Sequence, residues 1–225
     1  MSSPFICPAC SVVWIDDVLS VTDLLARGEV GPTTQEIVAQ ADFSKVARVG
    51  MSFGGATAAA ACYVDIRCSA AVNLDGFDIH RIGVNREIPV PLLMIYSDFE
   101  PSALDDEEAS RFTLAFNDHS YESLLTRGTR DDVLRIKIKD VLHNGFSNDI
   151  LLHRGPLKSM LSGSIDGAVM TDLMNDYVLN FLEKHHRGAL SSGPDPMVAY
   201  GDIVQRQDMT KHRTWWANLS LQERQ

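Results

Sequence analysis

The chain has 225 residues, of which 45% are hydrophobic and 22% are charged, and its formal net charge at pH 7 is −10. This composition is typical of a globular protein with a hydrophobic core, and it excludes a disordered chain, a collagen and a coiled coil. The excess of acidic residues argues against non-specific binding to nucleic acid or to anionic membranes. We therefore expect the partner to be a small molecule or another protein.

The N-terminal segment predicts neither export nor membrane insertion. The first basic residue is Arg27, and Pro8 interrupts the apolar stretch around residues 5–14, so the positive region of a signal peptide is missing. No apolar run reaches the roughly 18 residues that a membrane-spanning helix needs. We therefore predict a cytoplasmic protein without a transmembrane segment.

The four cysteines are expected to be reduced thiols in a cytoplasmic protein of this size. Cys7 and Cys10 have the CxxC spacing of a redox motif or of half a zinc site, but no predicted strand precedes them. The other two, Cys62 and Cys68, do not form a second CxxC pair. We therefore predict no metal and no cofactor.

Short apolar runs alternate with helical segments along the chain, a pattern typical of a parallel α/β fold. The apolar residues Trp14, Val18, Val21 and Leu25 fall on one face at helical spacing, and Gly28 follows them, so residues 14–27 are predicted to form an amphipathic helix. The other predicted helices are residues 53–64, 102–117 and 168–184. The predicted strands are residues 45–51, 69–74, 89–96 and 133–138.

These elements are predicted to form one domain over residues 14–187. Residues 1–13 are expected to be an N-terminal tail, and residues 188–225 a C-terminal tail. The cluster Gly193-Pro194-Asp195-Pro196 breaks regular structure in the second tail. Further along, Trp215 and Trp216 are expected either to dock on the domain or to form a contact with another molecule.

The segment Gly50-Met51-Ser52-Phe53-Gly54-Gly55 carries the strongest chemical signal. It has the pattern GxSxG between a predicted strand and a predicted helix, which is the setting of a nucleophile elbow. The turn is tight, so we expect the glycines at positions 50 and 54 to remove colliding Cβ atoms. Ser52 is thus the predicted nucleophile, and the backbone N–H of Phe53 is the predicted oxyanion donor. A glycine-rich turn that only packs is the alternative, which the strand, the helix and Gly55 disfavour.

A serine hydroxyl is a weak nucleophile, so it needs a histidine as base and a carboxylate that orients the histidine. Of the seven histidines, His143 follows the fourth predicted strand, at the sheet edge where parallel sheets bind ligands. Asp75 ends the second predicted strand and Asp98 ends the third. Both keep the chain order Ser, Asp, His, so physical reasoning alone leaves the two acids open.

A family resemblance adds to these motifs. Gly50–Thr57, followed by Asp65-Ile66-Arg67 and Asn73-Leu74-Asp75, resembles the platelet-activating factor acetylhydrolase branch of the α/β-hydrolases. Residues 143–149 and the predicted last helix are also similar, so the resemblance covers roughly residues 14–187. It implies a three-layer α/β-hydrolase-type sheet, with Asp75 preferred to Asp98 as the acid and His143 as the base. It also implies calcium-independent hydrolysis of short or oxidised acyl esters of phospholipids, as by a 1-alkyl-2-acetylglycerophosphocholine esterase.

The chain departs from this family ahead of the elbow. A complete α/β-hydrolase places several strands before the elbow strand, and a loop there, often marked by a His-Gly pair, supplies the second oxyanion donor. No histidine precedes Ser52 in this sequence. We therefore expect a sheet that is truncated on its N-terminal side, with about four recognisable strands. One flank of the elbow strand would be exposed, which favours a homodimer through that edge.

The predicted activity is acyl transfer from a small-molecule ester or a phospholipid to Ser52. We expect Met51, Phe77 and Leu142 to line an acyl pocket, although side chains of this kind more often pack in the core. Two alternatives remain open. One is another carboxylesterase, such as a polyester or dienelactone-type hydrolase. The other is a catalytically impaired, truncated homologue that acts as a binding module.

Overall fold

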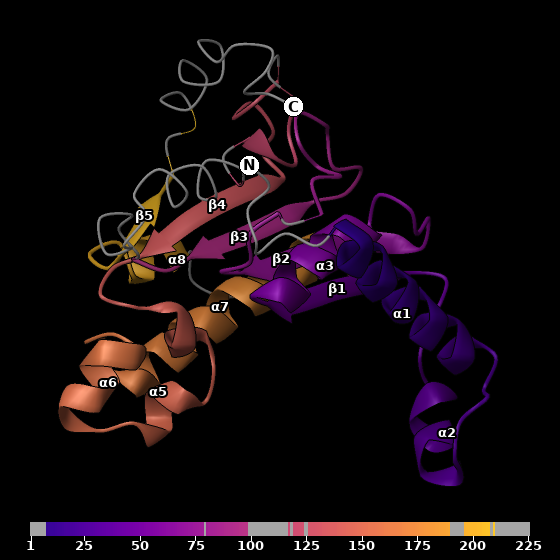
Figure 1. Cartoon of the computed structure of the whole chain (residues 1–225), viewed down its shortest axis with the longest axis horizontal. Coiled ribbons are helices and arrows are strands. Elements are labelled where there is room, and N and C mark those ends of the chain that lie inside the picture. The colour runs from indigo at the N-terminus through magenta and orange to yellow at the C-terminus, as the bar shows by residue number, and fades with distance from the viewer. Residues whose placement is uncertain are drawn as a thin grey trace.

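The computed structural model describes residues 8–78, 80–98, 117, 119–123, 126–189, 196–207 and 209. Its centre is a five-stranded sheet in the order β1-β2-β3-β4-β5, drawn in Figure 1. The strands are β1 (Val46–Met51), β2 (Cys68–Leu74), β3 (Leu92–Tyr96), β4 (Val133–Ile138) and β5 (Val204–Arg206). The first four are parallel, and β5 pairs with β4 in the antiparallel direction.

Helices connect and cover these strands. They are α1 (Pro8–Ala26), α2 (Pro32–Val38), α3 (Phe53–Ala61), α5 (Asp149–Leu152), α6 (Gly155–Leu161), α7 (Gly167–His185) and α8 (Pro196–Ala199), with a 3-10 helix η2 (His143–Phe146). None of the helices that the structure describes is long and apolar enough to cross a membrane.

The sheet separates two hydrophobic clusters, because successive side chains of a strand point to opposite faces. On one face Val72 and Leu93 pack with residues of α7, and on the other face Ala71 and Leu92 pack with residues of α3. Helix α1 lies against α3, outside the sheet. The result is the three-layer α/β arrangement that the sequence predicts.

Helix α7 covers its face of the sheet through one buried stripe. The stripe consists of Met170, Leu173, Tyr177 and Phe181, whose spacing of three or four residues keeps them on one side of the helix. Asp166 caps the helix by accepting hydrogen bonds from the backbone N–H groups of Ala168 and Val169. The cap defines where the helix begins, and the stripe defines the face that it buries.

A cluster of charged side chains connects α1 and β1 to the loop between α3 and β2. Asp65 is buried and pairs with both Arg48 of β1 and Arg67, and Arg67 reaches on to Asp23 of α1 at 2.7 Å. Arg48 also approaches Thr22 of α1. A buried charge is costly unless it is paired, and here the buried charges of Arg48 and Asp65 pair with each other while α1 adds contacts from Thr22 and the half-exposed Asp23.

Both predicted tails need correction. Residues 8–13 belong to α1, which begins at Pro8, a residue that the first turn of a helix tolerates. At the other end, residues 204–206 form β5. A three-residue edge strand is too short to produce an alternating pattern, which is why the sequence did not reveal it.

The prediction of four reduced cysteines is also wrong, because Cys62 and Cys68 form a disulfide bond. Cys62 follows the end of α3 and Cys68 begins β2, and the turn between them brings their Cα atoms to 5.2 Å, within the range that a disulfide spans. Cys7 lies outside the described residues, as do almost all of the predicted helix 102–117 and the pair Trp215 and Trp216.

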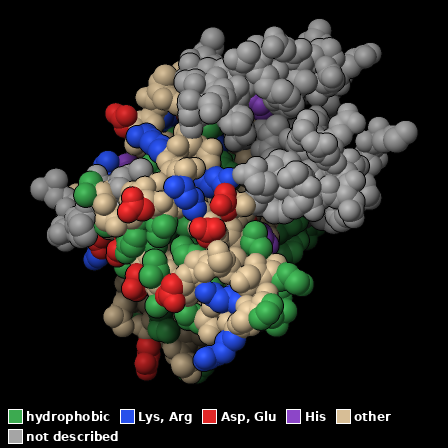
Figure 2. Space-filling view, turned by 90° about the vertical axis from the view of Figure 1, so that its left-hand side faces the viewer, with side chains coloured by type: hydrophobic (Ala, Val, Ile, Leu, Met, Phe, Trp, Pro, Cys, Tyr) green, Lys and Arg blue, Asp and Glu red, His purple; other side chains and the backbone are tan. Residues whose placement is uncertain are grey.

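Two surfaces of the fold are notable. Within the described sheet β1 pairs only with β2, so it is an edge strand, as expected; the homodimer through this edge stays a prediction. The second surface lies on the left of Figure 1, where α5 and α6 expose Leu152 and Met160. Figure 2 shows hydrophobic side chains interspersed with charges of both signs on the described part of that face.

The α7 stripe gives a prediction about stability. Leu173 is fully buried, whereas Leu179 on the same helix is 59% exposed. We expect Leu173→Ala to lower the free energy of unfolding by about 2–5 kcal/mol, because it leaves a cavity against the sheet. Leu179→Ala is the matched control and should change it by less than about 0.5 kcal/mol. Urea denaturation measures both, and equal losses in the two variants would contradict the assigned packing.

Candidate active site

Ser52 lies in a tight turn between β1 and α3. Its backbone has φ 55° and ψ −128°, a conformation that a non-glycine residue rarely adopts. A Cβ on Gly50 would lie 2.3 Å from the backbone of Gly54, and a Cβ on Gly55 would lie 2.3 Å from Asn73 Oδ1. The predicted role of Gly54 is therefore wrong in part: a Cβ there meets open space, and Gly55 is the second glycine that the turn requires.

Asp75 follows β2 and adopts a similar left-handed conformation, with φ 54°. The next residue, Gly76, packs directly on the serine turn, because a Cβ at Gly76 would lie 2.1 Å from the carbonyl oxygen of Ser52. Ser52 also donates its backbone N–H to the carbonyl of Leu74 at 2.8 Å. The serine turn and the aspartate turn are thus held against each other by close backbone contact.

His143 begins η2 in the loop after β4, and it lies between the two turns. Its Nε2 is 2.9 Å from Ser52 Oγ, and its Nδ1 is 2.7 Å from Asp75 Oδ2. An ionised carboxylate can only accept a hydrogen bond, so Nδ1 carries the proton and donates it to Asp75. The lone pair of Nε2 is then free to accept the Ser52 hydroxyl. The three side chains form a continuous chain of hydrogen bonds.

Asp75 is the better buried partner of this pair. It is 7% exposed, and its Oδ1 accepts the backbone N–H of Ser97 at 2.7 Å, whereas the side chain of His143 is 44% exposed. The hydrogen bond to Asp75 raises the pKa of His143, against the smaller opposing effect of its partial burial. The Asp75 carboxylate therefore favours the protonated form of the histidine.

Asp98, the other predicted acid, lies elsewhere. It forms an ion pair with Lys137 of β4 at 2.7 Å and accepts the backbone N–H of Asp140. The described structure therefore sets Asp75, and not Asp98, against His143. Position at a strand end could not distinguish the two acids, because both strands end at the same edge of the sheet.

The residues predicted for the acyl pocket are distributed differently. Met51 packs against the hydrophobic cluster on the α7 face, while Phe77 and Leu142 are half-buried. The groove that the structure places beside the elbow lies between α1, β1 and α3, and its lining includes Trp14, Val18, Val49 and Ala58. The acyl pocket stays a prediction.

Two aromatic rings lie near Phe53, the residue after Ser52, a feature that the sequence did not reveal. The ring of Phe53 lies 4.4 Å from that of Trp14 and 5.8 Å from that of His80, measured between centroids. His80 Nε2 is 3.1 Å from the hydroxyl of Thr57, which donates its own proton to the Phe53 carbonyl. Nε2 of His80 must therefore be the donor, which orients this histidine toward α3 rather than toward Ser52.

Within the described residues, no group of three or more His, Cys, Asp or Glu side chains is arranged to hold a metal ion. A hydroxyl, an imidazole and a carboxylate in series can move a proton away from the hydroxyl as it attacks an acyl carbon.

Comparison with known proteins identifies a family. Residues 31–191 match the family model described as platelet-activating factor acetylhydrolase, isoform II. The chain belongs to this family. A platelet-activating factor acetylhydrolase of Cavia porcellus is 31% identical over 159 residues, which are 67% of this chain and 32% of that protein. The chain therefore spans about a third of the length of this relative, and the resemblance seen in the sequence is confirmed.

A solved structure shows the same fold at lower identity. The ferulic acid esterase from Streptomyces cinnamoneus superposes with a TM-score of 0.61 and 20% sequence identity, over 92% of this chain and 57% of that one. At this identity the likeness concerns the fold alone. It confirms the α/β-hydrolase-type architecture that the family resemblance implied.

The glycines of the turn give a second prediction. We expect Gly55→Ala to lower the free energy of unfolding by about 1–3 kcal/mol, because its Cβ meets Asn73 in a packed region. Gly54→Ala, the matched control one residue away, meets open space and should be neutral or slightly stabilising. Urea denaturation of both variants checks this. A Gly54→Ala variant as unstable as Gly55→Ala would contradict the close contacts described for the elbow.

Proposed function

We propose that this chain carries the catalytic centre of a serine ester hydrolase, with Ser52 as the nucleophile, His143 as the general base and Asp75 as the residue that orients the base. One observation carries the proposal. The hydroxyl, the imidazole and the carboxylate are joined by hydrogen bonds of 2.9 and 2.7 Å, on a serine whose backbone is held in a rare conformation. Membership of the acetylhydrolase family supports it.

The reaction would proceed by acyl transfer in two halves. As Ser52 Oγ attacks the ester carbonyl, His143 Nε2 takes its proton, and Asp75 stabilises the imidazolium that results. The tetrahedral intermediate collapses, the C–O bond to the alcohol breaks, and His143 returns the proton to the leaving alcohol. Water, activated by the same histidine, then attacks the acyl-enzyme and releases the acid.

The oxyanion of each tetrahedral intermediate would be bound by the backbone N–H of Phe53. This group is the first of α3, where free N–H groups and the helix dipole favour negative charge. Loss of one oxyanion donor typically lowers kcat by about 10²–10³. We therefore expect slow turnover if the Phe53 N–H acts alone.

The first candidate substrate is a phospholipid with a short acyl chain, such as an acetyl ester. The family match and the Cavia porcellus acetylhydrolase support this choice. A carboxylesterase acting on esters with a flat apolar group is the second candidate. It is favoured by the rings of Trp14 and His80, which both lie near Phe53, the residue after the proposed nucleophile.

Labelling of Ser52 tests the proposal. The wild-type chain should react with a fluorophosphonate probe and hydrolyse a p-nitrophenyl ester, and Ser52→Ala should lose both activities because the nucleophile is gone. Ser44→Ala is the matched control, since Ser44 is an exposed serine of the same region. A folded wild-type chain that is not labelled would favour the binding-module alternative. Release from an acetyl phospholipid compared with an aromatic ester then separates the two substrate classes.

The pH dependence of the reaction tests the role of Asp75. His143 must be neutral to act as base, and Asp75 raises its pKa above the ordinary value near 6.5, so wild-type kcat/KM should rise with pH through that raised pKa. Asp75→Asn removes the carboxylate, which should move this acid limb to lower pH and reduce kcat by about 10⁴. Asp98→Asn should leave the limb unmoved. A limb that shifts in Asp98→Asn and not in Asp75→Asn would reverse the assignment.

A further inference from the structure

The backbone that carries Asp75 is held from two sides by asparagine side chains. Asn117 donates from Nδ2 to the carbonyl of Gly76 at 2.9 Å, and its Oδ1 accepts the backbone N–H of Asp78 at 2.8 Å. Asn73 also donates to the carbonyl of Gly76, at 3.0 Å, and accepts the Gly76 N–H at 2.8 Å. The peptide groups that follow Asp75 are therefore hydrogen-bonded to one side chain from β2 and to one from far along the chain.

These hydrogen bonds matter because the backbone conformation of Asp75 is unfavourable without support from its surroundings. Asp75 has φ 54°, in the left-handed region that disfavours a residue with a Cβ, so this conformation persists only where the surroundings fix it. Asn117 is 2% exposed, and Asp78 is equally buried. Without the Asn117 amide, the buried N–H of Asp78 would lose its acceptor and the Gly76 carbonyl would lose one of its two amide donors.

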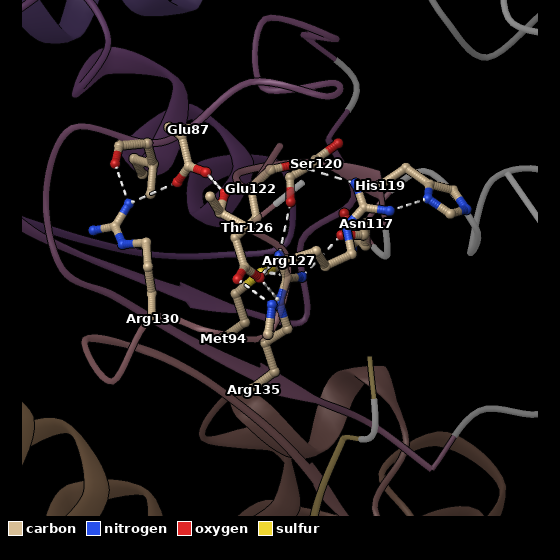
Figure 3. Close-up of polar contacts among 12 residues, drawn as sticks. Glu87, Met94, Asn117, His119, Ser120, Glu122, Thr126, Arg127, Arg130 and Arg135 are labelled. Atoms are coloured by element: carbon tan, nitrogen blue, oxygen red, sulfur yellow. Dashed lines mark hydrogen bonds and ion pairs between the residues drawn. The ribbon is translucent and has the colours of Figure 1, made fainter. Parts of the chain in front are cut away.

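The position of Asn117 is in turn fixed from the sheet, as Figure 3 shows. Arg135 of β4 donates to the backbone carbonyls of Asn117 at 2.9 Å and of Ser120 at 2.7 Å, and it pairs with the carboxylate of Glu122 at 3.1 Å. The side chains of Arg135 and Glu122 are only 2% and 1% exposed. A planar guanidinium can satisfy these acceptors together, which an ammonium group cannot.

We propose that Asn117 is a positioning residue for Asp75, and that Arg135 anchors it to the sheet. An amide side chain suits this role because it offers a donor and an acceptor at once, and the turn presents one carbonyl and one N–H to it. The inference rests on the proposed function, in which Asp75 orients His143. Asn117 touches neither the nucleophile nor the base in the described structure, so it acts only through the turn.

The expected consequence is a loss of catalysis rather than of substrate binding. If the turn relaxes, Asp75 Oδ2 moves from His143 Nδ1, and a displacement of about 1 Å at a catalytic group can lower the rate about 10²-fold. Asp75 is the one charged group, among the described residues, that raises the pKa of His143. A weaker contact should therefore lower that pKa toward its ordinary value.

The test compares Asn117→Ala with Arg130→Gln. Arg130 pairs with Glu87 and Asp132, and Figure 3 shows it apart from Asn117 and Arg135. Rates are divided by the concentration of active sites, which the fluorophosphonate titrates. We expect Asn117→Ala to lower kcat by about 10–100-fold and to leave KM little changed. The acid limb of kcat/KM should move to lower pH. Arg130→Gln should leave the limb in place. Arg135→Lys should reproduce the shift in weaker form.

A second measurement does not depend on turnover. The pKa of the His143 imidazole can be followed by NMR in the Ser52→Ala background, with and without Asn117→Ala. A lower pKa in the double variant supports the positioning role even if the wild-type chain proves to hydrolyse no ester, an outcome that would end only the proposed function. An unchanged pKa and an unchanged acid limb, in a folded Asn117→Ala variant of an active chain, would overturn the inference.

Discussion

The contact between the carbonyl of Ser52 and Gly76 is the constraint on which the rest of the site depends. Two backbone turns, one after β1 and one after β2, approach so closely that no side chain fits at position 76. Neighbouring parallel strands lie about 4.8 Å apart, so turns at their carboxyl ends are already close. Glycine at position 76 allows them to touch. The hydroxyl and the carboxylate are thereby brought within reach of one imidazole.

The two residues with a strained backbone at the site, Ser52 and Asp75, have polar side chains that glycine lacks. Ser52 and Asp75 both have φ near +55°, where a Cβ is unfavourable. Their neighbours compensate: glycines remove competing atoms, and the amides of Asn73 and Asn117 bind the backbone that follows Asp75. The side chains of Ser52 and Asp75 are therefore carried by unfavourable backbone conformations that packed surroundings enforce.

The sequence was informative where a signal is local. The strand ends at residues 51, 74 and 96 were predicted correctly because apolar runs and turn residues coincide there. The elbow pattern predicted Ser52, and position after a strand predicted His143, but only the family resemblance chose Asp75 over Asp98. The arrangement of the three side chains agrees with these choices, while their catalytic roles stay a proposal.

The sequence was silent where the cause is tertiary. Asn117 donates a hydrogen bond to Gly76, which is 41 positions away in the sequence, and no local sequence pattern near either residue predicts this contact. The Cys62–Cys68 bond depends on a turn that the spacing alone does not define, and β5 depends on an available edge of β4 rather than on its own pattern. The role expected of Gly54 belonged to Gly55 because the close neighbour, Asn73, comes from another strand.

Strand β1 lies at the edge of the described sheet, and this position makes the Ser52 turn easier to disturb than the Asp75 turn. Strand β1 carries the nucleophile at its end, yet its hydrogen-bond ladder runs along β2 alone, whereas β2 and β3 are bonded on both sides. Elements bonded on one side open locally at a lower free-energy cost than elements in the interior. Mild warming should therefore separate Ser52 from His143 through fraying of β1, while the far-UV circular dichroism of the remaining strands and helices is still intact.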